Sequence, residues 1–148
     1  MGYSDRDIFL IPVSKQQTEV PHPDLIIVST PGKGRAIATT SDLNVGIIVE
    51  EAPVIPMSAE DRKLLDQTLL HDYIFEWNPE ETSGCCMALG WIPLFNHSYR
   101  SNCEYVMDYD AQIMRIETIR PVTAHEELTI NYNGDWDDQT PVWFDVVE

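Results

Sequence analysis

The chain has 148 residues, enough for one hydrophobic core and too few for two comfortable domains. Its 25 acidic residues outnumber its 9 basic residues, and the formal charge of −16 argues against nucleic acid as a partner because phosphates would be repelled. Such a charge suits a Lys/Arg-rich protein partner, although an acidic surface also serves simply to keep a protein soluble.

Cysteine content and hydropathy limit the cellular setting. Three cysteines, at positions 85, 86 and 103, are too few for a disulfide framework, and no CxxC pair predicts a metal site. No apolar run approaches the roughly 20 residues of a membrane span, and the first residues lack the basic region of a signal peptide. We therefore expect an intracellular, soluble protein without a metal and without a membrane partner, located in the cytoplasm or, in a eukaryotic or viral setting, in the nucleus.

The first third of the chain predicts short strands. Apolar runs rich in β-branched residues at 8–13, 25–29 and 46–50 are typical of buried strands. A Pro-Gly-Lys-Gly sequence at 31–34 predicts a turn after the second of them.

One substantial helix is predicted over residues 59–77. Ser58 and Asp61 have the spacing of an N-terminal cap, and apolar side chains then recur every four residues. Asn78-Pro79 would end the helix.

The remaining pattern is again that of strands. Residues 112–119 and 128–132 alternate as strands do, and an acidic tail with three large aromatic residues follows at 134–148. Many short strands and one helix indicate a mostly-β domain.

A dense polar segment, LFNHSYRSNC at 94–103, favours turns over regular structure. His97-Ser98 is a weak hydrolase signal, because no G-x-S-x-G turn is present and adjacent strand residues point apart. Cys103 with His97 is a weak thiol–imidazole signal, because a lone cysteine is more often packed in a core. Asn96-His97-Ser98 also matches a glycosylation sequon, without a secretion signal to support it. Composition and spacing alone leave a mostly-β domain with a polar loop.

Three segments taken together carry a more specific pattern. They are GRAIATTSDLNVGIIVEEAPV at 34–54, LFNHSYRSN at 94–102 and HEELTINYN at 125–133. In this order they resemble the SET domain of protein-lysine methyltransferases. The central stretch, HDYIFEWNP at 71–79 and MALGWIPLFNHS at 87–98, is most similar to the compact viral and bacterial members of that family.

The glycine element of the family can be placed in two registers. Gly32-Lys33-Gly34 fits G-x-G literally, whereas the spacing to the following Asp-x-x-x-Gly favours Gly34-Arg35-Ala36. In the second register Ala36 replaces a family glycine, which predicts some crowding of the cofactor.

The resemblance implies S-adenosylmethionine as the cofactor, and no metal. It implies that residues around Lys33 line the methionine end, where a basic side chain meets the carboxylate, and that His97 reaches the adenine largely through its backbone. The cofactor residues that it implies are Lys33, Gly34, Arg35, Tyr73, Asn96 and His97.

The resemblance also implies that Tyr132 is the catalytic tyrosine, and that Tyr105 and Trp136 contact the substrate. Each aromatic residue has a simpler interpretation as well. Tyr132 also fits a half-buried strand, Tyr73 also fits the apolar stripe of a helix, and isolated tryptophans in a tail also dock for burial alone.

The family implies a SET (β-clip) fold of several small sheets with one main helix and a knot-like C-terminal crossing. We expect one domain over 1–148, with the resemblance covering about 25–136 and a tail at 137–148. The implied activity is methyl transfer to a lysine of a basic protein, histone-like or otherwise Lys/Arg-rich. Because no cysteine-rich zinc segment follows, the tail or a second subunit would complete the lysine channel, and a homodimer is expected. The alternative is a catalytically inactive SET-like binding module, suggested by Ala36 and the short tail.

Overall fold

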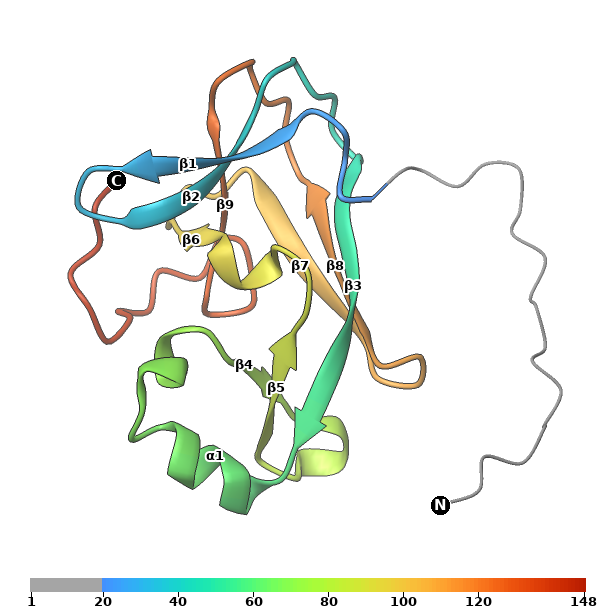
Figure 1. Cartoon of the computed structure of the whole chain (residues 1–148), viewed down its shortest axis with the longest axis vertical. Coiled ribbons are helices and arrows are strands. Elements are labelled where there is room, and N and C mark those ends of the chain that lie inside the picture. Colours follow the sequence, from blue (N-terminus) through green and yellow to red (C-terminus); the bar gives the residue numbers. More distant parts are fainter. Residues whose placement is uncertain (1–19) are drawn as a thin grey trace, which may run out of the picture.

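The strands of the protein form two sheets (Figure 1), in a computed structural model that describes residues 20–148. The predicted strand at 8–13 lies outside this range. The mostly-β prediction is confirmed. In their order across the sheet, the strands of the first sheet are β1 (Leu25–Thr30), β2 (Gly34–Thr39), β9 (Glu127–Ile130) and β6 (Asn96–His97). Those of the second are, again in order, β4 (Phe75–Trp77), β5 (Gly84–Ala88), β3 (Ile48–Met57), β8 (Ile113–Thr118) and β7 (Cys103–Asp108).

The β1–β2 hairpin closes through the predicted glycine turn. Gly32 and Gly34 have φ values of +80° and +77°, a region that side chains with a Cβ rarely adopt. The amide of Lys33 donates a hydrogen bond to the carbonyl of Thr30 at 3.2 Å. The two glycines thus let the chain reverse tightly and leave Lys33 at the tip of the hairpin.

The long strand β3 organises the second sheet. Its first half pairs antiparallel with β8 and its second half with β5, so it runs the length of this sheet in Figure 1. The side chains of Val49, Ala52 and Val54 are buried in the common core. The prediction of a strand at 46–50 therefore located the element but missed more than half of it.

The predicted helix over 59–77 is wrong beyond its first two turns. Helix α1 covers Ala59–Leu65 and has the predicted capping box between Ser58 and Asp61. Thr68 then caps a separate 3₁₀ turn, η1 (Leu69–Asp72), and the chain continues into strand β4. Trp77 gains burial by pairing β4 with β5, which a continued helix would not provide.

Two short 3₁₀ turns complete the connections, η2 (Pro79–Glu81) and η3 (Ile92–Leu94). After η3, β6 lies beside β9 in a parallel pair, with Asn96 opposite Thr129 and His97 opposite Ile130. The polar segment at 94–103 therefore meets the segment at 125–133. Within residues 20–148, no helix has the length and apolar character that crossing a membrane requires.

Candidate active site

Tyr132 lies two residues after the end of β9 and borders three hollows of the surface. Its backbone N–H donates to Nδ1 of His97 at 3.0 Å, and its hydroxyl donates to the carbonyl oxygen of Phe95 at 2.7 Å. The side chain of Tyr132 lines all three hollows. Burial raises the pKa of the phenol, and the neighbouring Tyr73, Asp72 and Glu127 raise it further, so the ring remains a neutral donor at physiological pH.

The largest hollow, of about 320 Å³, gathers most of the residues that the sequence predicted for the cofactor. We call it the cofactor cleft. The tip of the β1–β2 hairpin, the start of β6 and the segment after η1 each form part of its wall. Its lining includes the predicted Lys33, Gly34, Arg35, Tyr73 and Asn96, together with Tyr132, Trp143 and Phe144.

Ala36 does not line this cleft. Its side chain is fully buried within β2, where the residue pairs with Val28 of β1. The methyl group therefore packs into the core and does not crowd the cleft, which removes one reason for considering the domain inactive.

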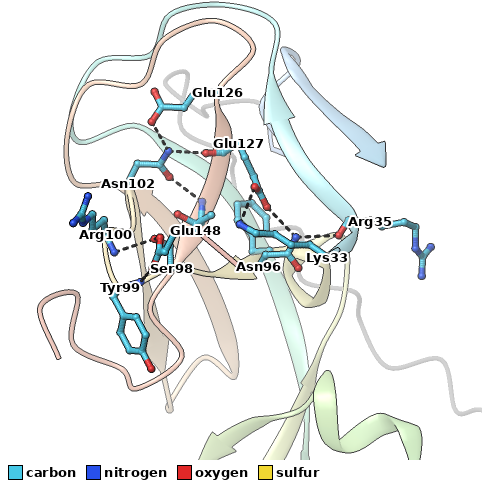
Figure 2. Close-up of polar contacts among 12 residues, drawn as sticks. Lys33, Arg35, Asn96, Ser98, Tyr99, Arg100, Asn102, Glu126, Glu127 and Glu148 are labelled. Carbon is cyan, nitrogen blue, oxygen red and sulfur yellow. Dashed lines mark hydrogen bonds and ion pairs between the residues drawn. The ribbon is translucent and has the colours of Figure 1, made fainter. Parts of the chain in front are cut away.

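A carboxylate from β9 ties two walls of the cofactor cleft together, as Figure 2 shows. Glu127 accepts a hydrogen bond from Nδ2 of Asn96 at 2.9 Å and forms an ion pair with Nζ of Lys33 at 3.3 Å. The same amide nitrogen of Asn96 donates to the carbonyl oxygen of Arg35 at 3.2 Å. The amide is thus held between three segments that are distant in the sequence.

His97 is buried beneath Tyr132 and is largely enclosed by aromatic rings. Its ring centroid lies 4.5 Å from that of Tyr99, 5.3 Å from that of Tyr132 and 6.0 Å from that of Phe144. Burial lowers the pKa of the imidazole, although Glu148 opposes this shift. Because Nδ1 accepts the amide of Tyr132, a neutral ring carries its proton on Nε2, which is buried and has no hydrogen-bond partner among the described residues. The side chain also borders a hollow of about 150 Å³ that adjoins the cofactor cleft.

A second hollow, of about 190 Å³, lies on the other side of Tyr132 and Trp143. We call it the substrate cavity. Its walls combine the rings of Phe75 and Tyr105, whose centroids are 5.4 Å apart, with the carboxylates of Asp72 and Glu76. Asp66 also lines the cavity, where its carboxylate lies 3.9 Å from the guanidinium of Arg62. Burial and the nearby Glu76 raise the pKa of Tyr105 to about 12. The cavity offers aromatic faces together with negative charge, a combination that favours a cation.

The C-terminal tail forms the partition between these hollows. The ring of Trp143 stacks on that of Tyr132, with centroids 6.0 Å apart and planes inclined by 22°, and its Nε1 donates to Asp72 at 3.2 Å. The carboxylate of Glu148 accepts hydrogen bonds from Oγ of Ser98 at 2.7 Å and from the amide of Tyr99 at 3.0 Å (Figure 2). Trp136, predicted to contact the substrate, is 55% exposed and borders none of the three hollows.

Sequence reasoning did not assign roles to Glu127, Trp143 or Phe144 individually. The tail as a whole was expected to complete the lysine channel, alone or with a second subunit, or to dock for burial alone. Glu127 stands beside Glu126 in the EEL sequence, and the sequence offers no sign of which carboxylate contacts the residues of the cleft. The structure distinguishes them, because Glu126 bonds to Asn102, Arg120 and the amide of Thr123.

The weak hydrolase and thiol signals find no support in the geometry. Oγ of Ser98 donates to Glu148 and accepts from the amide of Arg100, while the Nδ1 of His97 is engaged by Tyr132. Cys103 is fully buried, and burial raises the pKa of its thiol, which makes the thiolate inaccessible. Residues 20–148 contain no group of three or more His, Cys, Asp or Glu side chains arranged to hold a metal ion.

Comparisons with known proteins agree on one family. The family model described as the SET domain matches residues 34–133. A protein of Schizosaccharomyces pombe, the histone-lysine N-methyltransferase specific for H3 lysine-37, is 30% identical over 122 residues, which cover 82% of this chain and 77% of the relative. A solved Plasmodium falciparum protein, assigned provisionally as a histone methyltransferase, shares the fold with a TM-score of 0.57 at 20% identity, covering 76% of this chain and 96% of that protein.

Proposed function

Because the chain belongs to the SET domain family of protein-lysine methyltransferases, we propose that it transfers a methyl group from S-adenosylmethionine to a lysine of a basic protein. The observation that carries the proposal is the position of Tyr132. One tyrosine side chain borders both the cofactor cleft and the substrate cavity. A group that must act where two reactants meet would occupy this position.

The chemistry of the cofactor cleft fits S-adenosylmethionine. The amino acid portion of that molecule carries one positive and one negative group, and Lys33 and the amide of Asn96 supply complementary polar atoms. The ring of Phe144 and that of Tyr73 offer flat surfaces of the kind on which an adenine packs. When bound, the cofactor would supply a methyl group that a neutral amine can attack directly, with the thioether S-adenosylhomocysteine as the leaving group.

The residues of the substrate cavity would hold the incoming lysine and favour the loss of its proton to the solvent. A lysine in water has a pKa near 10.4 and is a poor nucleophile at neutral pH because it is protonated. Asp72 and Glu76 attract the cation to the cavity, and the rings of Tyr105, Tyr132 and Trp143 exclude water around its end. Exclusion of water favours the neutral amine, which can attack. The Tyr132 hydroxyl would then orient the amine and the methyl group relative to one another.

The substrate class is proposed from charge. The fission yeast relative is named for a lysine of histone H3, and histone tails are rich in Lys and Arg. A chain of net charge −16 would attract such tails, as it would attract other basic proteins.

The test of the proposed function is Tyr132→Phe. We expect transfer of radiolabelled methyl groups to core histones or basic peptides to fall about 100-fold or more in kcat, by analogy with the loss of one positioned donor at other active sites. Binding of S-adenosylhomocysteine, measured by calorimetry, should persist, because the ring remains.

Tyr109→Phe is the matched control, because Tyr109 packs on Trp77 and borders none of the three hollows. Undiminished transfer by Tyr132→Phe would refute the assignment of Tyr132. Cofactor binding without transfer to any basic protein would instead favour the inactive binding module.

A further inference from the structure

Glu127 touches two residues of the cofactor cleft without lining the cleft itself. One carboxylate oxygen accepts from Nδ2 of Asn96 at 2.9 Å, and the other lies 3.3 Å from Nζ of Lys33 (Figure 2). The side chains of Lys33 and Glu127 are 13% and 22% exposed, so the pair is largely removed from water. Partial burial makes the contacts of this carboxylate stronger than those of a surface ion pair.

These contacts decide which way the amide of Asn96 faces. The carboxylate of Glu127 and the carbonyl of Arg35 are both acceptors, so the amide must turn its NH₂ group toward them. Both donor hydrogens are then used inside the protein, and Oδ1 remains available as an acceptor. Without Glu127, only the carbonyl of Arg35 would hold the amide in this orientation.

The same carboxylate fixes the ammonium of Lys33. One of its three donor hydrogens is directed at Glu127, which leaves two for a ligand in the cleft. The charge of Glu127 also offsets that of a partly buried cation. The ion pair therefore restricts the long side chain of Lys33 to fewer rotamers than it would have in solvent.

We propose that Glu127 is a positioning residue that presets Asn96 as an acceptor and Lys33 as a cationic donor. This inference rests on the proposed function. An acceptor beside a cationic donor matches a group that carries an ammonium and a carboxylate on one carbon, as the amino acid end of the cofactor does. The role of Glu127 is then specific to that end of the ligand, because its two contacts both lie on residues that face it.

The experiment measures binding of two ligands by calorimetry, S-adenosylhomocysteine and 5′-methylthioadenosine, which lacks the amino acid portion. We expect Glu127→Ala to weaken binding of S-adenosylhomocysteine by about tenfold or more, as the loss of a charge-assisted contact would. The affinity for 5′-methylthioadenosine should change by less than about twofold, which is clearly smaller than the tenfold loss expected for S-adenosylhomocysteine. Glu127→Gln keeps an acceptor for Asn96 without the charge, and its affinity should lie between those of wild type and Glu127→Ala.

Glu126→Gln is the matched control, since it neutralises the adjacent carboxylate, which bonds to Asn102 and Arg120 instead. It should bind both ligands as wild type does. An unchanged affinity of Glu127→Ala for S-adenosylhomocysteine would overturn the inference, and so would an equal loss of affinity for both ligands, which would indicate a structural defect. If wild type binds no S-adenosylhomocysteine, the proposed function itself fails. If wild type binds it and Glu127→Ala binds it equally well, only the inference about Glu127 fails.

Discussion

The imidazole of His97 connects the chemistry of the site to pH. Its Nδ1 accepts the amide of Tyr132, and burial lowers its pKa below the ordinary value near 6.5. Protonation would place a hydrogen on Nδ1, opposite the N–H of Tyr132. An acidic solution therefore works against the position of the proposed catalytic residue itself.

We predict that His97 makes the folded state less stable as the pH is lowered through about 6.5. Below this pH the unfolded chain binds a proton at His97 while the folded chain does not, so the free energy of unfolding decreases until the folded pKa is reached. Each unit by which the pKa is lowered contributes at most about 1.4 kcal/mol. Urea unfolding at several pH values between 5 and 8 measures this dependence.

The comparison requires variants, because other groups titrate too. Glu50, whose pKa burial raises, contributes with the opposite sign as the pH falls. His97→Asn should show a flatter decline than wild type. The control is His125→Asn, since His125 is exposed and has a φ of +70° that Asn tolerates. A slope that His97→Asn leaves unchanged would contradict the prediction.

At the scale of elements, the tail from 139 to 148 contributes most to the partition of the site. Trp143 remains 55% exposed although it stacks on Tyr132 and donates to Asp72. Burial alone does not explain the position of Trp143, whereas its place in the lining of both the cofactor cleft and the substrate cavity does. The tail therefore places Trp143 where its ring borders both hollows.

We predict that Trp143→Ala lowers kcat/KM for a basic peptide by about tenfold. An aromatic pair and an exposed hydrogen bond to a carboxylate together contribute about 1–2 kcal/mol, which corresponds to this factor. Trp143→Phe keeps the ring, loses the bond to Asp72 and should show a smaller effect. Steady-state kinetics of Trp136→Ala complete the comparison. If Trp136→Ala lowered kcat/KM and Trp143→Ala left it unchanged, the prediction would be wrong and the substrate would be placed at Trp136.

The elements also show what sequence reasoning can reach. Strands with β-branched runs, such as β1 and β8, and the capped start of α1 were predictable because their signals are local. The continuation of α1 was not, because Leu69 and Trp77 keep helical spacing while Trp77 is buried by pairing β4 with β5. Motif resemblance named several of the residues that line the cofactor cleft, but not Trp143 or Phe144. Glu127 was missed because its partners lie on β6 and on the β1–β2 turn.

At the scale of the whole molecule, the charge of −16 is the dominant property. The carboxylates of Asp66, Asp72 and Glu76 bring part of it to the substrate cavity, and exposed acids follow in the loop after Tyr132. Electrostatic attraction accelerates association with a basic partner and weakens as salt shortens the Debye length.

We predict that Asp135→Asn with Asp137→Asn reduces kcat/KM for a basic peptide at low ionic strength and flattens its salt dependence. Asp138 is excluded, because its carboxylate accepts the amide of Thr140 and its substitution would disturb the turn. The matched control exchanges Glu80 and Glu81 for Gln, which removes the same charge from exposed positions in η2. Kinetics from about 20 to 300 mM salt, a range over which screening changes several-fold, compare the two variants. Identical salt profiles for both pairs would reject steering by the loop.

Strand β9 hydrogen-bonds to β2 on one side and to β6 on the other, although β2 lies near the start of the described chain and β9 near its end. Contacts between such distant segments form slowly, because the entropy of closing a long loop is lost before the contacts contribute any stabilisation. During synthesis, Lys33 and Asn96 are made before Glu127 and Tyr132. A nascent chain interrupted before β9 would lack the strand that joins β2 to β6, together with Glu127 and Tyr132.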